Sequence, residues 1–314
     1  MKKLFGVLAV VVAVVCVWVL AMYVSKNPEH RELDSSARSA APGKFVRLAD
    51  GVTHYQIDGP DSGRTVVLVH GFSVPYYIWD STAAALAGAG YRVVRYDEYG
   101  RGWSDRPKVA YTAELFDRQL AQLLDSLNIH SPVDVAGVSA GGAVVATFAS
   151  RHVANTHSVV LVDPVAGVRG DVSFPYTVPG VGPILWQAFV VPGMAAGQMS
   201  DFAHPDRFPN WADRYREQMQ YRGFGHALLA SRRGSMSVRM DSVYRALAGT
   251  GVPVLLLWGK EDNTVPFANN ESVRADIPSV EFHAIDDAGH LPILERAALA
   301  DSLILQFLAR HSDR

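Results

Sequence analysis

A serine flanked by glycines marks the point where a β-prone run gives way to an apolar helical pattern. It is Ser139, within a Gly-x-Ser-x-Gly pattern over residues 137–141, between a strand expected at 133–136 and a helix expected at 140–150. Glycines allow the close backbone approach that such a tight turn needs. The free N–H groups of a helix N-terminus favour developing negative charge beside the hydroxyl. The pattern therefore predicts a nucleophilic serine, although a glycine-rich turn with a capping serine is the alternative.

A nucleophilic serine needs a base to take its proton and a carboxylate to orient that base. Asp262 comes shortly after a strand expected at 252–258, and His290 follows a strand expected at 280–285. Both positions lie where an open α/β sheet places its site, beyond the carboxyl ends of the strands. The sequence therefore predicts a triad of Ser139, Asp262 and His290.

The same residues allow other roles. Asp163 ends the preceding strand and is the alternative acid, while Asp262 could instead cap the helix that follows it. Its neighbour Glu261 is expected to point elsewhere. His290 could be an ordinary surface histidine, but its place after a strand and beside Gly289 favours catalysis.

Acyl transfer also needs two N–H groups aimed at the developing oxyanion. We expect one from Ala140, directly after the serine, and the other from Phe72 in the loop after the strand at 65–70, where Gly71 permits close approach. His70 is expected to hold this loop by hydrogen bonds. The charged loop from residue 97 to 105 is expected to brace the surroundings of the site.

These residues must be held by a regular framework, and strands alternating with helices predict an α/β fold with a mostly parallel, doubly wound sheet. An Asp-Gly dipeptide at residues 50–51 predicts a hairpin. The expected elements are strands at 44–48, 52–57, 65–70, 91–96, 133–136, 158–162, 252–258 and 280–285, and helices at 79–89, 112–127, 140–150, 267–275 and 293–309.

The alternation breaks at about residues 166–239, which are rich in Gly, Pro, Met and aromatic residues with helical patches. This stretch predicts an inserted, mainly helical cap. Its Met and aromatic side chains suit a pocket for acyl chains, although most of them are expected to form the core of the cap itself. Acidic residues such as Asp213 and Glu217 could instead recognise an amine.

The N-terminus predicts a membrane segment. Lys2 and Lys3 precede residues 4–24, which carry no charge and would span roughly 30 Å as a helix. Residues 1–24 therefore predict a single-pass anchor with the catalytic domain outside the cytoplasm, in the periplasm; a cleaved signal peptide, and hence a secreted enzyme, is the alternative. Residues 25–43 predict a polar linker that lifts a catalytic domain at 44–314 off the membrane.

Composition narrows the partners of the chain. Its 314 residues are 49% hydrophobic and carry a formal net charge of -2, with no basic stripe, which argues against nucleic acid. Cys16 is the single cysteine, so there is no internal disulfide and no cysteine-based metal site. The oligomeric state does not follow from these features.

Taken together, the motifs resemble the α/β-hydrolase superfamily: they are His70-Gly71-Phe72, Asp97 to Asp105, Gly137 to Gly142, Trp258 to Asp262 and Ala288 to His290. The anchor and cap are similar to those of membrane-anchored bacterial lipases and esterases and of monoacylglycerol-lipase-like enzymes. The resemblance implies an α/β-hydrolase fold and cleavage of carboxylic esters or lipids with an apolar acyl part, without a metal or other cofactor.

Other chemistry occurs on the same fold. Haloalkane dehalogenases and epoxide hydrolases of this superfamily have Asp where this chain has Ser139, which argues against both activities. The open alternatives are an amidase or peptidase, a C–C bond hydrolase, a lyase, and a non-catalytic ligand-binding member of the fold.

Overall fold

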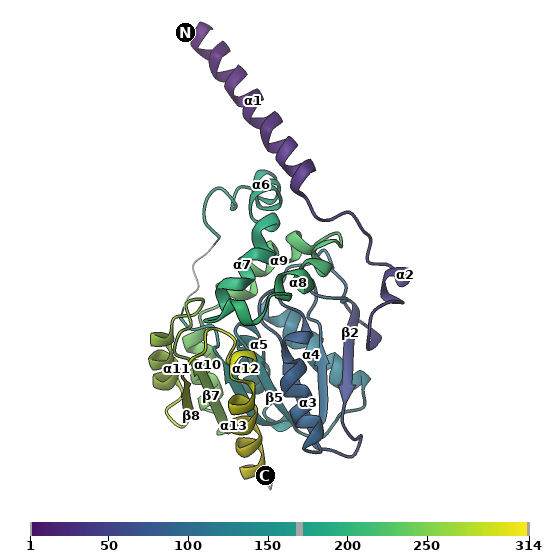
Figure 1. Ribbon diagram of the computed structural model, residues 1–314, viewed down its shortest axis with the longest axis vertical. Coiled ribbons are helices and arrows are strands. Elements are labelled where there is room, and N and C mark those ends of the chain that lie inside the picture. The colour runs from purple at the N-terminus through teal and green to yellow at the C-terminus, as the bar shows by residue number, and fades with distance from the viewer. Residues whose placement is uncertain (1, 168–171, 313–314) are drawn as a thin grey trace.

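The computed structural model describes residues 2–167 and 172–312 and is built on one eight-stranded sheet (Figure 1). The order of strands across the sheet is β1-β2-β4-β3-β5-β6-β7-β8. The strands are β1 Lys44–Leu48, β2 Gly51–Asp58, β3 Thr65–Val69, β4 Arg92–Tyr96, β5 Val133–Val138, β6 Thr156–Val162, β7 Val254–Gly259 and β8 Glu281–Ile285.

The sheet is mostly parallel, as the sequence predicts. β1 and β2 form the expected hairpin, in which Leu48 pairs with Gly51, and β2 runs antiparallel to β4. All further pairings, from β4 through β3 to β8, are parallel. Parallel strands end at one edge of a sheet, so the loops that follow β3, β4, β5, β6, β7 and β8 gather there.

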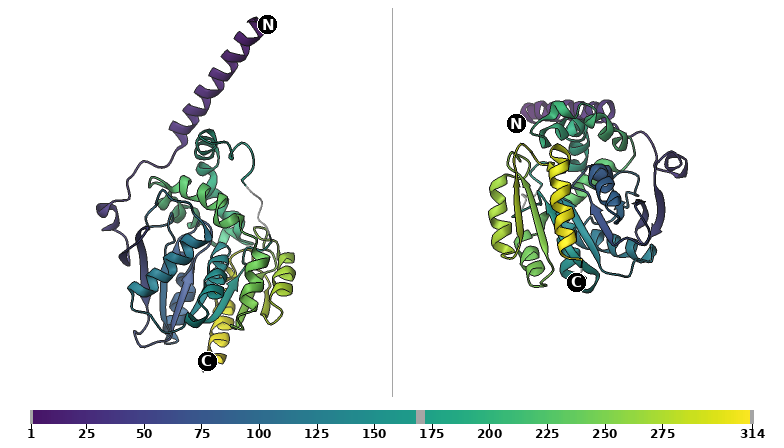
Figure 2. Two further views of the ribbon diagram at one scale, coloured as in Figure 1. Left: turned by 180° about the vertical axis from the view of Figure 1, so that it is seen from behind. Right: turned by 60° about the horizontal axis from the view of Figure 1, so that its bottom comes forward.

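Helices cover both faces of the sheet and bury a separate apolar core on each (Figures 1 and 2). One face is covered by α4 Ala113–Ser126, α5 Ala140–Arg151, α10 Met240–Ala248 and α11 Asn270–Asp276, and the other by α3 Asp80–Gly88, α12 Pro292–Glu295 and α13 Ala297–Arg310. α10 was not predicted from the sequence, although its buried Met240, Tyr244 and Leu247 have helical spacing. One closing helix was expected at residues 293–309, where the structure has α12 and α13 separated at Arg296.

The insertion between β6 and β7 covers the carboxyl edge of the sheet, with helices and short 3-10 turns and no strand among its described residues (Figure 1). Its α-helices are α6 Val181–Phe189, α7 Met194–Gly197, α8 Trp211–Met219 and α9 Phe224–Arg233. Part of the expected cap, residues 168–171, lies outside the described residues. We call the described part of this insertion the cap.

The N-terminal helix α1, Lys2–Lys26, projects away from the rest of the chain (Figure 1). None of its described residues is buried. It contains an 18-residue stretch with a mean hydropathy of 3.0, so the helix is long and apolar enough to cross a membrane. A signal sequence near the N-terminus can meet the same criteria of length and apolarity.

The segment after α1 contacts the cap. The N–H groups of His30 and Arg31 both donate to the Gln220 carbonyl at 2.9 Å, and the Arg222 N–H donates to the Arg31 carbonyl at 2.9 Å. The backbone of this segment therefore pairs with the loop between α8 and α9, and the assignment of residues 25–43 as a linker stays a prediction.

Candidate active site

Ser139 lies at the turn between β5 and α5 in a strained backbone conformation. Its φ is 53° and its ψ is -118°, a region that non-glycine residues rarely adopt. A Cβ on Gly137 would come within 2.3 Å of the Gly141 carbonyl oxygen, and one on Gly141 within 2.4 Å of the Val69 carbonyl oxygen. The two glycines of the pattern are therefore required by close backbone approach.

Asp262 and His290 meet at the same edge of the sheet. The Asp262 Oδ2 atom lies 2.7 Å from Nδ1 of His290. The other oxygen, Oδ1, accepts the N–H groups of Thr264 and Val265, each at 2.8 Å. Both oxygens are thus held, and the imidazole is oriented with Nε2 left for another partner.

Ser139 and His290 line one pocket above the carboxyl edge of the sheet. Apart from these two residues, the lining consists of Gly71, Phe72, Ser73, Val74, Ile78, Val138, Gln198, Asp201, Thr264 and Leu291. Residues from the loops after β3, β5, β7 and β8 and from the cap therefore meet there. A substrate in this pocket would contact the serine and the imidazole together.

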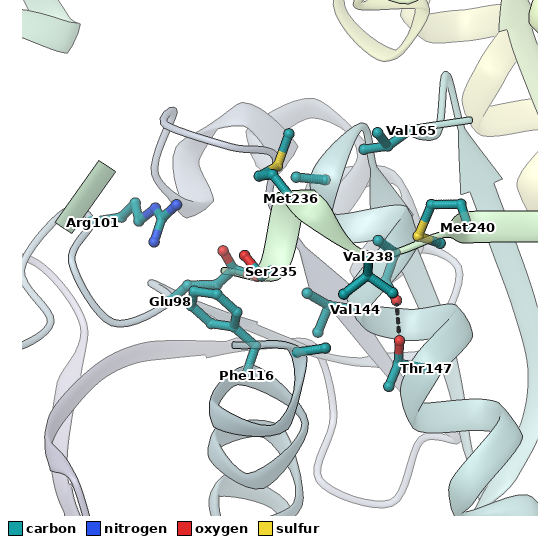
Figure 3. Close-up of a pocket in the computed structure, with 13 residues that line it drawn as sticks. Glu98, Arg101, Phe116, Val144, Thr147, Val165, Ser235, Met236, Val238 and Met240 are labelled. Carbon is teal, nitrogen blue, oxygen red and sulfur yellow. Dashed lines mark hydrogen bonds between the residues drawn. The ribbon is translucent and has the colours of Figure 1, made fainter. Parts of the chain in front are cut away.

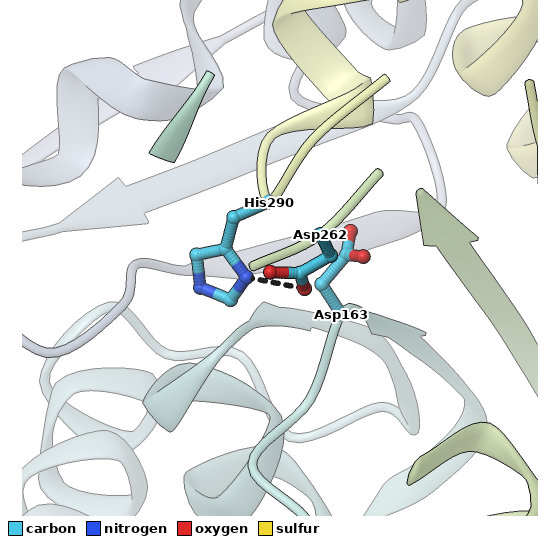
Figure 4. Close-up of side chains that lie close together, drawn as sticks. All are labelled: Asp163, Asp262 and His290. Atoms are coloured by element: carbon cyan, nitrogen blue, oxygen red, sulfur yellow. Dashed lines mark hydrogen bonds and ion pairs between the residues drawn. The ribbon is translucent and has the colours of Figure 1, made fainter. Parts of the chain in front are cut away.

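The alternative acid, Asp163, is buried beside this pair (Figure 4). Its Oδ1 accepts the Gly259 N–H at 2.8 Å, and its Oδ2 accepts no hydrogen bond. Burial, and then the carboxylate of Asp262, raise the pKa of Asp163 well above its ordinary value. Asp163 therefore favours its protonated form, and of the two carboxyl groups it is Asp262 that is bonded to His290.

Asp163, Asp262 and His290 also form the kind of group that can hold a metal ion, because their ligand atoms all lie within 4.8 Å of one another. The hydrogen bonds of Asp262 occupy both of its oxygens, and Nδ1 of His290 is directed at one of them. These hydrogen bonds account for the orientation of Asp262 and His290 in the cluster.

The loop after β3 lies against the serine. A Cβ on Gly71 would be 3.3 Å from the Ser139 Cβ. The Phe72 carbonyl accepts a 2.8 Å hydrogen bond from Nε of the buried Arg101. Among the described residues, no hydrogen bond occupies the N–H of Phe72 or of Ala140. Two unoccupied N–H groups thus come from the segments on either side of the serine.

His70 has the structural role that the sequence analysis expects. Its Nε2 accepts the Glu98 N–H at 2.9 Å, so Nδ1 carries the proton and donates to the Gly71 carbonyl at 2.7 Å. Burial lowers the pKa of His70 to about 4, which keeps the imidazole neutral. The histidine therefore joins the loop after β3 to the loop after β4.

The loop after β4 is a brace, as expected. Asp97 accepts the N–H groups of Tyr76 and Trp103 at 2.9 Å each and lies 2.7 Å from Nδ1 of His54. Burial acts to raise the pKa of Asp97, but these hydrogen bonds and the neighbouring histidines lower it below its ordinary value. The carboxylate stays charged and ties the loop to β2 and to the segment before α3.

A second pocket, mainly apolar, adjoins Ala140 on the side of α5 (Figure 3). Buried Glu98 and Arg101 stand at its wall, and Glu98 Oε1 has no hydrogen-bond partner. Burial raises the pKa of Glu98 to about 8. The apolar part of the lining consists of Ala113, Phe116, Ala140, Ala143, Val144, Val165, Met236, Val238 and Met240.

Two residues near the imidazole were missed from the sequence, Asp201 and Glu295. The backbone carbonyl of Asp201 accepts the backbone N–H of His290 at 2.7 Å. Glu295, on α12, accepts the N–H groups of Gly289 at 2.7 Å and of His204 at 2.8 Å. The cap and the histidine loop are thus joined by charge-assisted bonds, and no local pattern in the sequence signals such long-range pairing.

Comparison with known proteins agrees with this architecture. Residues 64–297 match the family described as alpha/beta hydrolase fold. The chain is 25% identical over 266 residues to an uncharacterized protein of Mycobacterium tuberculosis, a match that covers 79% of this chain and 76% of that protein.

A second relative has a named activity. The 2-hydroxy-6-oxononadienedioate/2-hydroxy-6-oxononatrienedioate hydrolase of Paraburkholderia xenovorans is 26% identical, over 88% of this chain and 98% of its own. Among solved structures, the enol-lactonase from Burkholderia xenovorans has a TM-score of 0.74 at 22% identity, covering 85% of this chain and 100% of its own. At that identity the structural likeness shows the fold alone.

Proposed function

Because the chain belongs to the alpha/beta hydrolase fold family, we propose that it is a serine hydrolase that cleaves carboxylic esters with an apolar acyl part. Ser139 is the proposed nucleophile, His290 the base and Asp262 the orienting acid. The backbone N–H groups of Phe72 and Ala140 form the proposed oxyanion hole. The chemistry requires no cofactor.

One observation carries this proposal. Ser139, on its strained turn, shares a pocket with His290, whose Nδ1 is 2.7 Å from Asp262. A histidine held in this way presents Nε2 as the base, which is the arrangement that activates a serine hydroxyl.

The reaction follows from these positions. Ser139 Oγ attacks the ester carbonyl while His290 Nε2 takes its proton, and the oxyanion accepts hydrogen bonds from Phe72 and Ala140. The imidazolium, stabilised by Asp262, then protonates the leaving alcohol. Water activated by the neutral His290 attacks the acyl-enzyme, and collapse of the second intermediate returns the proton to Ser139 and releases the acid.

The pocket beside Ala140 supports an apolar acyl group. Phe116, Val144, Val165 and Met236 line it, next to the N–H that would hold the oxyanion (Figure 3). Flexible Met and rigid aromatic side chains suit alkyl chains. The acyl chain would therefore extend from Ser139 under the segment that joins α9 to α10.

A second candidate comes from the Paraburkholderia relative, which is a hydrolase of 2-hydroxy-6-oxo dienedioates. A substrate of that kind carries carboxylates, and buried Arg101 at the pocket wall could pair with one. Turnover of a panel with ester, amide and diketone substrates separates the two candidates.

We further propose that residues 1–24 anchor the enzyme in a membrane and that residues 44–314, including the cap, form the catalytic domain outside the cytoplasm. The exposed, apolar α1 supports the anchor. Secretion after cleavage of residues 1–24 is the alternative, and the apparent mass of the mature protein distinguishes the two.

Labelling with a fluorophosphonate tests the nucleophile. We expect the wild type to be labelled, Ser139→Ala to remain unlabelled, and the control Ser150→Ala, further along α5, to be labelled like the wild type. Persistent labelling of Ser139→Ala would exclude this serine. A wild type that is labelled but cleaves no ester would leave the nucleophile intact and exclude the ester substrates.

A further inference from the structure

The cap divides into two segments of different polarity. Residues 172–200 contain no Asp, Glu, Lys, Arg or His, whereas α8 and α9 carry charged side chains. The apolar side chains on the outside of the first segment are not shielded: Val181 is 51% exposed, Ile184 44%, Phe189 37% and Phe174 81%. A patch of this kind marks a surface that meets another apolar phase.

The helix α6, which carries three of these four residues, lies beside α1, and Figure 1 shows it at the base of α1. The rings of Trp18 and Phe189 are 5.2 Å apart. At about 1.5 Å per residue, Trp18 lies roughly 9 Å of helix inside Val24, where the charge-free run of α1 ends. If residues 4–24 fill the hydrocarbon layer, Phe189 reaches into the same layer.

Hydrogen bonds fix α1 in this position relative to the cap. Gln187, on α6, donates through Nε2 to the Asn27 side chain at 2.7 Å and to Glu29 Oε1 at 2.9 Å. The Glu29 carboxylate also accepts the N–H groups of Gly223 at 2.6 Å and of Gly225 at 2.7 Å. These bonds hold the residues that directly follow α1 against α6 and α9, and those to the Glu29 carboxylate are charge-assisted.

Cationic side chains border the apolar patch on the side of the globular domain. Lys26 ends α1, and Arg233, at the end of α9, donates to the Tyr176 carbonyl. Lys and Arg side chains at the boundary between an apolar surface and water are favourably placed to bind lipid phosphates.

We propose that α6 and the uncharged segment 172–200 insert into the lipid bilayer beside α1, with acyl chains covering their exposed apolar face. This inference rests on the proposed anchor and is independent of the chemistry of Ser139. Helices that lie in the membrane surface bury their apolar face about 5–10 Å deep. The cap over the proposed active site would then be seated in the bilayer surface, where an apolar ester can enter it directly from lipid.

Fluorescence quenching in the full-length protein tests the insertion. The protein is reconstituted in phosphatidylcholine vesicles with or without brominated acyl chains, and a polarity-sensitive thiol probe is attached to Cys16, the single cysteine. A Cys16→Ala/Ile184→Cys variant carries the probe on α6. A Cys16→Ala/Leu299→Cys variant is the matched control, because Leu299 is a similarly exposed apolar residue, 41%, on α13.

We expect brominated lipid to quench the probes at positions 16 and 184 to a similar extent and to leave the probe at 299 unchanged. Quenching at 16 without quenching at 184 would overturn the insertion of α6 and leave the anchor standing. Absence of quenching at both would overturn the anchor and the insertion together. Equal melting temperatures of the three labelled proteins show that the substitutions leave the fold intact, and neither result bears on Ser139.

Discussion

Two buried carboxyl groups stand on opposite sides of Ser139 along the sheet, and both hold their protons more tightly than an ordinary carboxyl. Asp163 follows β6; burial, and then the nearby Asp262 carboxylate, raise its pKa well above the ordinary value. Glu98 follows β4; burial raises its pKa to about 8, although the cation of Arg101 acts to lower it.

The two groups differ in their surroundings. Asp163 lies beside Asp262, whose other neighbour is the Nδ1 atom of His290 at 2.7 Å. Glu98 Oε1 has no hydrogen-bond partner and stands at the wall of an apolar pocket, near the Arg101 that holds Phe72. One carboxyl thus adjoins the partner of His290, whereas the other belongs to a region whose charge changes with pH.

Replacing Asp163 and Asp262 separately tests which of the two carboxyl groups supports His290. Asp262→Asn removes the charge that orients His290 and stabilises the imidazolium, so we expect kcat for an ester to fall by about ten-thousand-fold. Asp163→Asn keeps a neutral donor at the same place, and we expect a loss of about ten-fold or less. Steady-state kinetics on both variants provides the measurement. A larger loss in Asp163→Asn than in Asp262→Asn would exchange the two roles.

On the other side of the serine, Arg101→Ala removes the bond to the Phe72 carbonyl. Without it the Phe72 N–H is no longer held toward the oxyanion, and removal of one such donor costs about a hundred- to a thousand-fold in kcat. We expect a drop in that range with little change in KM. Arg118→Ala, which loses only an ion pair with Asp50 at the surface, is the control. Equal kinetics in the two variants would show that Arg101 does not position the loop.

Local sequence signals predicted the framework of this site. The Gly-x-Ser-x-Gly pattern, the strands of the parallel sheet and the brace formed by His70 follow from short stretches of sequence, because tight turns and buried strands restrict residue types locally. The raised pKa of Asp163 does not, because it depends on its burial beside Asp262, at two strand ends that meet only in the folded sheet. The pairing of the expected linker with the cap also joins segments far apart in sequence.

Glu295 couples the cap to the histidine loop. In Glu295→Gln the charge is lost, and an amide NH2 would face one of the N–H groups that the carboxylate now accepts. We expect kcat to fall by roughly ten-fold and the free energy of unfolding by about 1–3 kcal/mol. Urea unfolding and ester kinetics measure the two effects, with exposed Glu271→Gln as the control. Unchanged kcat together with lost stability would restrict Glu295 to a structural role.

Glu98→Gln has the smallest expected effect on the reaction near neutral pH, because the amide resembles the protonated acid. Its effect appears in the pH dependence of stability. Folding raises the pKa of Glu98 from its ordinary 4.5 to about 8. The contribution of the protonated Glu98 to the free energy of unfolding is therefore complete below pH 4.5 and is lost as the pH rises through 8. The wild type should therefore lose up to about 1.4 kcal/mol per pH unit relative to Glu98→Gln across that window. Urea unfolding of both proteins from pH 5 to pH 9 measures the slope, and parallel curves would show that Glu98 is ionised in the folded protein, paired with Arg101.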